Sequence, residues 1–214
     1  MRNHPGEAID TEVAVAAQPA ETVRIRQAQL SDVQDVLRLI NDYAAKSVML
    51  PRTEVEICES LRDFLVATVD GELVGCGALH FYTAHMAELR SLAVAPSRTR
   101  TGLGQQITQA LLEQARQFGV DVVFAFTYVP HFFEKVGFRI VDRAALPLKA
   151  WKDCVRCPMF HACDEIAIAY PVTPGAEKYM SAEPPEQPYV EGPLVMPTLG
   201  QPRILDKERP ARGK

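Results

Sequence analysis

Residues 94–107 read VAPSRTRTGLGQQI, and this stretch decides how the chain is interpreted. It joins an apolar, strand-like run to the start of a helical pattern through a polar turn that contains Gly102 and Gly104. The first N–H groups of a helix have no acceptor within the helix, and the helix dipole makes that end positive. Because glycines also let the backbone approach a bulky anion, the turn is suited to holding a pyrophosphate.

Two familiar phosphate-binding motifs do not match this turn. The chain has no G-x-x-x-x-G-K-[ST] segment here, and the third glycine of G-x-G-x-x-G is missing. Arg98 and Arg100 add positive charge beside the turn. For the glycine spacing alone, a plain helix start remains the alternative interpretation.

The composition is that of a globular domain. Of 214 residues, 47% are apolar and 23% are charged, and the net charge of −4 gives no reason to expect nucleic acid or an anionic membrane as the main partner. No apolar run approaches the ~20 residues of a membrane helix, and the N-terminus lacks the order of a secretory signal. We therefore expect a cytoplasmic protein, with no membrane contact and with its five cysteines reduced.

Composition also divides the chain into three parts. Residues 1–22 are small and polar and predict a flexible leader, whereas residues 22–171 carry the periodic patterns of a folded domain. Residues 172–214 hold many of the sixteen prolines, which predicts a Pro-rich, disordered tail.

The hydrophobic periods within 22–171 alternate between strand and helix. A capping box of Ser31 and Gln34 and a second one of Thr53 and Glu56 predict two helix starts, and Asp70-Gly71 predicts a two-residue hairpin turn. The order βααβββαβαββ indicates a mixed α/β domain. The expected strands are Val23–Arg26, Phe64–Val69, Leu73–Phe81, Ala87–Val94, Asp121–Phe126, Phe138–Asp142 and Ile166–Tyr170, and the later helices are Gly102–Phe118 and Pro130–Val136.

Two motifs on these elements resemble the GCN5-related N-acetyltransferase (GNAT) family. The segment VAPSRTRTGLG is similar to the family's pyrophosphate loop, and FFEKVGF, Phe132–Phe138, is similar to its later F-Y-E-K-x-G-F helix. The resemblance covers about residues 22–171 and implies the GNAT fold, a mixed, mostly antiparallel six- to seven-stranded sheet flanked by helices. The run LPLKAWKDCVRCPMFHACDEIAI resembles more narrowly the short, stand-alone amino-acid N-acetyltransferases that are N-acetylglutamate synthase-like.

The resemblance implies acetyl-CoA as co-substrate, with its thioester where strand Ala87–Val94 separates from strand Asp121–Phe126. It implies cofactor contacts from the first of these strands and from the turn, through Leu92, Ala93, Val94, Thr99, Arg100, Thr101, Gly102, Leu103 and Gly104. Two positions depart from the family pattern. Thr99 replaces a Gln or Arg, and Phe133 replaces a Tyr that often protonates the departing thiolate, so another group or water has to supply that proton.

Glu88 is the expected general base for the incoming amine. Strand alternation places Glu88, Arg90 and Leu92 on one face, with Leu89, Ser91 and Ala93 on the other. A carboxylate at this point of the family's central strand commonly accepts the proton, directly or through water. The alternative is a strand-end carboxylate in a salt bridge, with Arg90 as its partner.

Arg90 is also the first candidate for binding the acceptor, because guanidinium groups hold carboxylates through two parallel hydrogen bonds. Lys149 and Lys152 are candidates for binding a second carboxylate of the acceptor. The alternative is that they are exposed lysines that only keep a loop solvated. His80 and His85 flank a turn near the expected acceptor entrance and are candidates for a part in catalysis. The alternative is that they are ordinary surface or core residues.

Cys154, Cys157, His161 and Cys163 are four potential soft metal ligands. They lie within ten residues, without the two well-separated pairs that are usual in zinc sites. We assign no metal to it. A loop of buried thiols is the favoured interpretation, with a metal site and a redox pair as alternatives.

Together these patterns predict an enzyme that transfers the acetyl group of acetyl-CoA to the α-amine of a small amino acid, with L-glutamate favoured, as in the first step of arginine biosynthesis. The amine would attack directly in a ternary complex. The alternatives are another amine (an amino acid, a polyamine or a protein N-terminus) and a non-catalytic acetyl-CoA-sensing module. The partner is then a small molecule, and a homodimer stays open.

Overall fold

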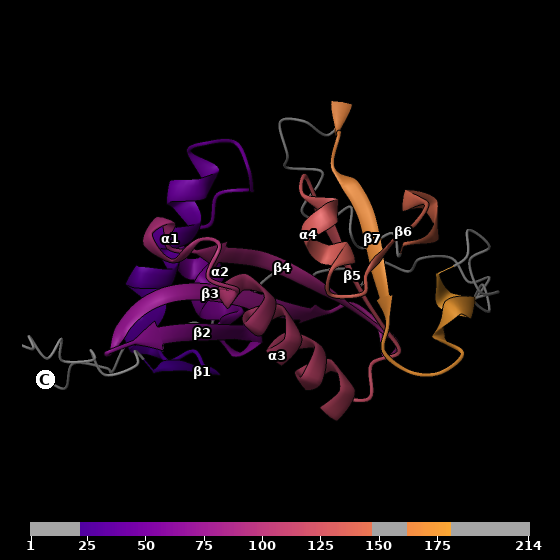
Figure 1. Cartoon of the computed structure of the whole chain (residues 1–214), viewed down its shortest axis with the longest axis horizontal. Helices are drawn as coiled ribbons and strands as arrows, with labels where there is room; N and C mark the ends of the chain where they lie inside the picture. Colours follow the sequence, from indigo (N-terminus) through magenta and orange to yellow (C-terminus); the bar gives the residue numbers. More distant parts are fainter. Residues whose placement is uncertain (1–21, 147–161, 181–214) are drawn as a thin grey trace, which may run out of the picture. The chain divides into compact units, whose positions relative to one another are not determined.

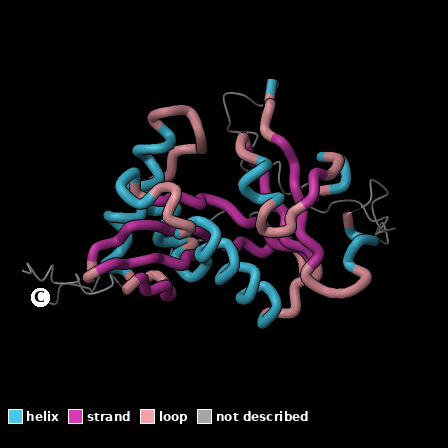
Figure 2. The backbone as a smooth tube through the Cα atoms, in the orientation of Figure 1, coloured by secondary structure: helices cyan, strands magenta, loops and turns pink. Residues whose placement is uncertain are grey.

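The computed structural model describes residues 22–146 and 162–180, which form one mixed sheet with helices on both faces (Figures 1 and 2). Its seven strands follow the order β1-β2-β3-β4-β5-β7-β6, and every neighbouring pair is antiparallel except β4 and β5. The strands are β1 (Val23–Gln27), β2 (Phe64–Val69), β3 (Glu72–Phe81), β4 (Met86–Val94), β5 (Val122–Thr127), β6 (Arg139–Ile140) and β7 (Ile166–Pro171). The expected fold class and the expected order of strands and helices along the chain are therefore confirmed.

In the part of the chain that the structure describes, four α-helices accompany the sheet: α1 (Val33–Ala44), α2 (Glu54–Glu59), α3 (Leu103–Gln117) and α4 (Pro130–Glu134). The capping box of Thr53 and Glu56 is present at the start of α2, as predicted. The one predicted at Ser31 is wrong, because a short 3₁₀ turn precedes α1 and the carboxylate of Asp32 accepts the backbone N–H of Gln29 at 2.7 Å. Asp32 is held there by a two-pronged ion pair with Arg26.

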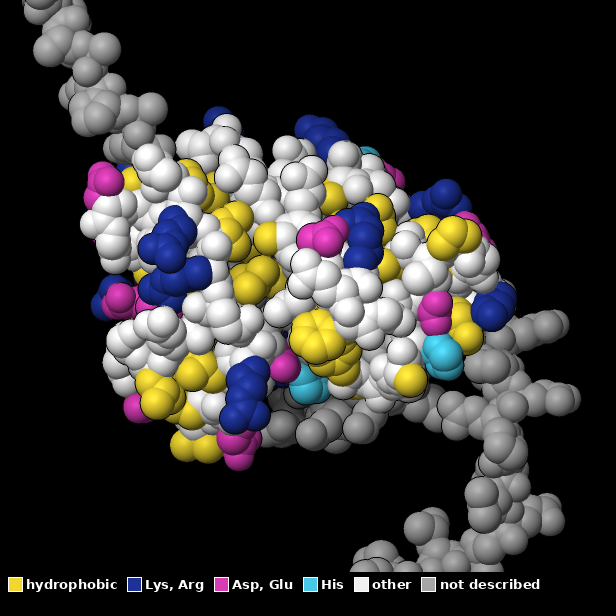
Figure 3. Space-filling model, turned by 90° about the horizontal axis from the view of Figure 1, so that it is seen from below, with side chains coloured by type: hydrophobic (Ala, Val, Ile, Leu, Met, Phe, Trp, Pro, Cys, Tyr) yellow, Lys and Arg dark blue, Asp and Glu magenta, His cyan; other side chains and the backbone are white. Residues whose placement is uncertain are grey.

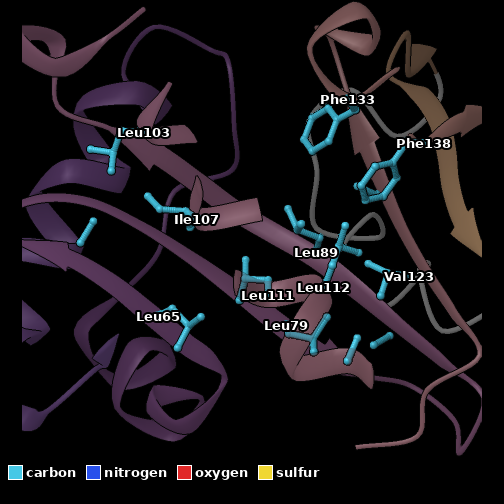
Figure 4. Close-up of a cluster of buried hydrophobic side chains, with 14 of the residues drawn as sticks. Leu65, Leu79, Leu89, Leu103, Ile107, Leu111, Leu112, Val123, Phe133 and Phe138 are labelled. Atoms are coloured by element: carbon cyan, nitrogen blue, oxygen red, sulfur yellow. The ribbon is translucent and has the colours of Figure 1, made fainter. Parts of the chain in front are cut away.

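The helix α3 covers one face of β2, β3 and β4, where its Leu103, Ile107 and Leu111 form the main core with Leu89 (Figure 4). On the other face, α1 and α2 bury a second cluster that includes Val36 and Ile40. The predicted hairpin turn between β2 and β3 is confirmed, with Asp70 and Gly71 both at positive φ.

The two halves of the sheet meet over a very short stretch. Strands β4 and β5 are paired only from Met86 opposite Val122 to Glu88 opposite Phe124. Beyond Glu88 the two strands separate, and Figure 1 shows β4 and β5 diverging. The separation that the resemblance implied is therefore present, and it begins at Glu88.

The folded part continues past the boundary expected at residue 171. A 3₁₀ turn at Ala176–Tyr179 packs against the sheet, with Ala176 buried, and the side chains of Thr173 and His85 both bind the carboxylate of Asp121. The prediction of disorder is thus wrong for residues 172–180, because proline density alone does not reveal these contacts. The leader and the rest of the tail lie outside the described residues.

No helix among the described residues has the length and apolar character needed to span a bilayer. On the face drawn in Figure 3, Lys and Arg side chains are interspersed with Asp and Glu side chains.

Candidate active site

A cavity of about 350 Å³ lies where β4 and β5 separate. Strand β4 contributes residues 88–92, and β5 with the following loop contributes residues 125–129. The remaining walls come from α1 and the loop after it, from α4, and from Glu165 just before β7; they are Tyr43, Val48, Met49, Leu50, Arg52, Phe132, Phe133 and Glu165. A cavity of this size and mixed lining is typical of a small-molecule site.

A β-bulge shapes the β4 wall of this cavity. In the β3–β4 ladder, Ala78 pairs with Arg90 and Cys76 with Ala93, so Ser91 and Leu92 together face a single β3 residue. Ser91 has a positive φ of 53°, which is unusual for a residue other than glycine. Ser91 and Leu92 both line the cavity, so the regular ladder is interrupted at the cavity wall.

The bulge also corrects the predicted alternation along β4. Leu92 packs with Leu89 on the α3 side, and Ala93 joins the cluster under α1. Glu88 and Arg90 therefore share a face without Leu92, because the extra residue reverses the alternation after Arg90.

The predicted cofactor turn lies at the far end of β4, where α3 begins. Gly102 is the residue before the first helical turn and has a φ of +84°, and Arg100 is also at positive φ. The hydroxyl of Thr99 donates to the carbonyl of Pro96, and that of Thr101 donates to the carbonyl of Arg98, so both stabilise the turn itself. Leu103 points into the core.

The turn is connected to the cavity through Gly104 and Phe132. A Cβ at Gly104 would lie 3.3 Å from the ring of Phe132, which lines the cavity, and 3.7 Å from the side chain of Val94. The hydroxyl of Tyr43, another lining residue, donates to the carbonyl of Val94 at 2.6 Å. The helix N-terminus and the cavity thus share one wall, which suits an elongated ligand with a phosphate end and a reactive end.

The polar groups of the cavity include those predicted on β4. Glu88 accepts a hydrogen bond from the hydroxyl of Tyr82 at 2.9 Å. Arg90 forms an ion pair with Asp63 at 3.8 Å, and a salt bridge between Glu88 and Arg90 stays the alternative interpretation of Glu88. Both Glu88 and Arg90 line the cavity, half-buried.

Phe133 is buried against Phe132 and Phe138, and it lines the cavity without a hydroxyl. Tyr128 also lines the cavity and is half-exposed, and the pKa of its hydroxyl is raised to about 12, mainly by burial and then by the carboxylate of Asp164. The two histidines do not line the cavity: His80 binds Asp63, and His85 binds Asp121.

Sequence reasoning missed three polar residues of this site. The Asn41 side chain forms hydrogen bonds with both the backbone N–H and the carbonyl of Arg52, which fixes Arg52 at the cavity. Glu165 faces the cavity from β7, and burial raises the pKa of its carboxyl group, against the opposing effect of Arg143. Tyr82 holds Glu88. Only Arg52 had a sequence signal, because it directly precedes the capping box of α2.

Lys149, Lys152, Cys154, Cys157 and His161 lie outside the described residues. Cys163 is described, and its thiol is 3.9 Å from the carboxylate of Glu165. Within residues 22–146 and 162–180, no group of His, Cys, Asp and Glu side chains is arranged to hold a metal ion.

Comparison with known proteins places this geometry in a family. Residues 33–138 match the model of the acetyltransferase (GNAT) family. An uncharacterised N-acetyltransferase of Chlorobaculum tepidum is 37% identical over 150 residues, which cover 70% of this chain and 97% of that protein. An amino-acid acetyltransferase of Mycobacterium tuberculosis is 33% identical over 149 residues, which cover 68% of this chain and 85% of that protein.

Among solved structures, an N-acetylglutamate synthase from Neisseria gonorrhoeae, complexed with coenzyme A and N-acetyl-glutamate, is 25% identical with a TM-score of 0.66. The match covers 73% of this chain and 36% of that one. The fold of this chain is therefore similar to that of a protein solved with coenzyme A bound. The chain belongs to the GNAT family and is an acetyl-CoA-dependent N-acetyltransferase.

Proposed function

We propose that this enzyme acetylates the α-amine of an amino acid and that L-glutamate is the favoured acceptor. The observation that carries the proposal is the charge pattern of one cavity: Glu88 lies where β4 and β5 part, and Arg90 and Arg52 line the same space. An amino acid offers an ammonium group for the carboxylate and carboxylate groups for the guanidinium groups. The names of the relatives support an amino-acid acceptor.

In the proposed reaction, Glu88 takes a proton from the acceptor's ammonium group, directly or through a water molecule. The free amine then attacks the thioester carbonyl, and a C–N bond forms while the carbonyl electrons move to oxygen. In this proposal, backbone N–H groups at the bulge around Leu92 stabilise that oxyanion. The nitrogen, which is positively charged after the attack, loses its second proton to water, and collapse of the intermediate breaks the C–S bond and releases the coenzyme A thiolate.

The thiolate needs a proton, and Phe133 cannot supply one. Coenzyme A thiolate is a tolerable leaving group, so a water molecule is sufficient for this step. The Arg90 side chain already has Asp63 as a partner, so binding the acceptor requires less ordering of that side chain, and Asn41 holds the backbone of Arg52 in place.

The test is thiol release from acetyl-CoA by the purified chain with a panel of acceptors: L-glutamate, L-glutamine, L-aspartate, L-lysine, spermidine and a short peptide. We expect turnover with amino acids of glutamate's length and none with spermidine or the peptide. Preferred use of spermidine or of the peptide would contradict the amino-acid assignment. Tight acetyl-CoA binding without turnover on any acceptor would favour a sensing module.

A further inference from the structure

Tyr82 lies where three strands of the sheet meet. It follows directly after β3, and its backbone N–H donates to the carbonyl of Met86 at the start of β4. Its ring stands edge-on to that of His80 on β3, at 5.1 Å between centroids, and is tilted against Phe124 on β5 at 5.6 Å. The ring is therefore supported from β3 and from β5 at once.

The strand register shows why the Tyr82 hydroxyl reaches Glu88. Glu88 pairs with His80 across the β3–β4 ladder and with Phe124 across the β4–β5 ladder. Tyr82 is two residues beyond His80 on the same face, so it is the diagonal neighbour of Glu88, within reach of an aromatic side chain. The hydroxyl donates to the carboxylate Oε2 at 2.9 Å.

His80 is itself fixed, because its Nδ1 lies 2.6 Å from Asp63 Oδ2. Asp63 comes from the short turn Leu61–Asp63 that precedes β2. The chain of contacts therefore runs from this turn through His80 and the Tyr82 ring to Glu88. Asp63 binds His80, the His80 ring supports the Tyr82 ring, and the Tyr82 hydroxyl donates to Glu88.

A glutamate side chain has three rotatable bonds, and a base has to keep one orientation while the acceptor approaches. A hydroxyl that donates to the carboxylate also favours its ionised form. We propose that Tyr82 is a positioning residue that holds Glu88 in the reactive orientation and in the ionised state. This inference rests on the proposed role of Glu88 as general base.

Other charged and titratable groups surround Glu88, and each comes from an identified strand, turn or loop. Among the described residues they include His80 on β3, Arg90 on β4 and Asp63 in the turn before β2, and Glu165 lines the same cavity, while β5 presents the apolar Phe124. Replacing Tyr82 by phenylalanine leaves all of these in place and removes only the hydroxyl.

The experiment compares the pH profile of kcat/KM for the wild type and Tyr82→Phe, with acetyl-CoA and the best acceptor. We expect kcat/KM to fall about 10-fold at neutral pH, since hydrogen bonds to charged groups are among the stronger ones. We also expect the acid limb to move to higher pH, because the carboxylate loses a donor. The control is Tyr170→Phe, which loses a hydroxyl bound to Arg116 away from the cavity and leaves the profile unchanged.

An unmoved acid limb in Tyr82→Phe would overturn the inference, because a residue that only packs lowers the rate without shifting the limb. If the variant is too unstable for a full profile, the effect of Tyr82→Phe is measured in the Glu88→Gln background. No further loss there supports the inference, and the same loss in both backgrounds overturns it. A Glu88→Gln enzyme as fast as the wild type would instead remove the base role itself.

Discussion

The two walls of the cavity hold their charged groups differently. On β4, Glu88 accepts a hydrogen bond from Tyr82, and Arg90 lies 3.8 Å from Asp63. On the β7 side, the Glu165 carboxylate accepts a hydrogen bond from the thiol of Cys163 at 3.9 Å, and burial is the largest influence on the pKa of Glu165, which it raises. One wall stabilises charge with specific partners, and the other has a carboxyl group that burial tends to keep neutral.

This difference separates two tasks that an acetyltransferase has to perform in one cavity. A base needs a carboxylate that is ionised at working pH, and hydrogen-bond donors provide that. A carboxyl group that selects among acceptors attracts some and repels others, and whether it repels a negatively charged acceptor depends on whether it is ionised. The wall formed by β4, with Glu88 and Arg90, suits the first task. The wall beside β7, with Glu165, suits the second, and we call them the β4 wall and the β7 wall.

The largest expected effect tests the β4 wall. Replacing Glu88 with glutamine keeps the shape and removes the base, so we expect kcat to fall roughly 10²–10⁴-fold with an unchanged Kd for acetyl-CoA. Steady-state thiol release and calorimetry measure the two quantities. Glu113→Gln, on the exposed face of α3, is the matched control. Unchanged kcat would remove Glu88 from the mechanism.

The second prediction concerns the turn at the end of the same wall. No atom lies within 4 Å of a Cβ built at Gly102, so its importance lies in the φ of +84°, which a β-branched residue adopts only with strain. Gly102→Val is expected to rearrange the turn and weaken acetyl-CoA binding about 10–100-fold, as measured by calorimetry.

Gly71 provides a matched control for this prediction, because it has a φ of +86° and equally open surroundings in the hairpin between β2 and β3. Gly71→Val should lower the melting temperature and leave the Kd for acetyl-CoA unchanged. Equal Kd values for both variants would show that the turn at Gly102 does not hold the phosphates.

These two predictions use residues that the sequence alone identified, and the reason is local. The glycine turn, the helix after it and the strand carrying Glu88 are continuous in the chain, so spacing and alternation reveal them. The bulge at Ser91 and Leu92 was not visible, because the letters LRSLAV continue an acceptable strand pattern and only the pairing with Cys76 and Ala78 shows the extra residue.

The β7 wall was missed for the opposite reason. Glu165 reaches the cavity only because β7 inserts between β5 and β6, which is a feature of topology rather than of local pattern. Tyr82 likewise meets Glu88 through a diagonal between strands, in a hairpin whose register the sequence does not specify. The sequence pointed to neighbours of both positions, His80 and His85 beside Tyr82 and Cys163 beside Glu165, but to neither residue itself.

The third prediction separates binding from chemistry on the β4 wall. Arg90→Gln removes a guanidinium group that lines the cavity, so KM for the amino acid should rise about 10-fold while kcat changes less. Arg38→Gln, whose side chain is exposed on α1, is the control. A fall in kcat with constant KM would assign Arg90 to the reaction itself rather than to acceptor binding.

The smallest expected effect tests the β7 wall through acceptor choice. Glutamate and glutamine differ only in the distal group, so deprotonation of the amine affects both equally and cancels in the ratio of their kcat/KM values. Because burial raises the pKa of Glu165, its carboxyl group becomes charged only as pH rises through that higher value, and it then repels a second carboxylate. The wild-type ratio of glutamate to glutamine should therefore fall with rising pH, by about 3–10-fold.

Glu165→Gln has no charge to gain, so its ratio should stay flat and should exceed the wild-type ratio at the upper end of the range. Arg143 opposes the effect by favouring the ionised form, and Asp164 adds to it, so both are kept unchanged in the comparison. Parallel ratio profiles for the two enzymes would mean that the distal group of the acceptor does not meet Glu165. The β7 wall would then contribute only to the shape of the cavity, and Arg90 and Arg52 would be the residues that select among acceptors.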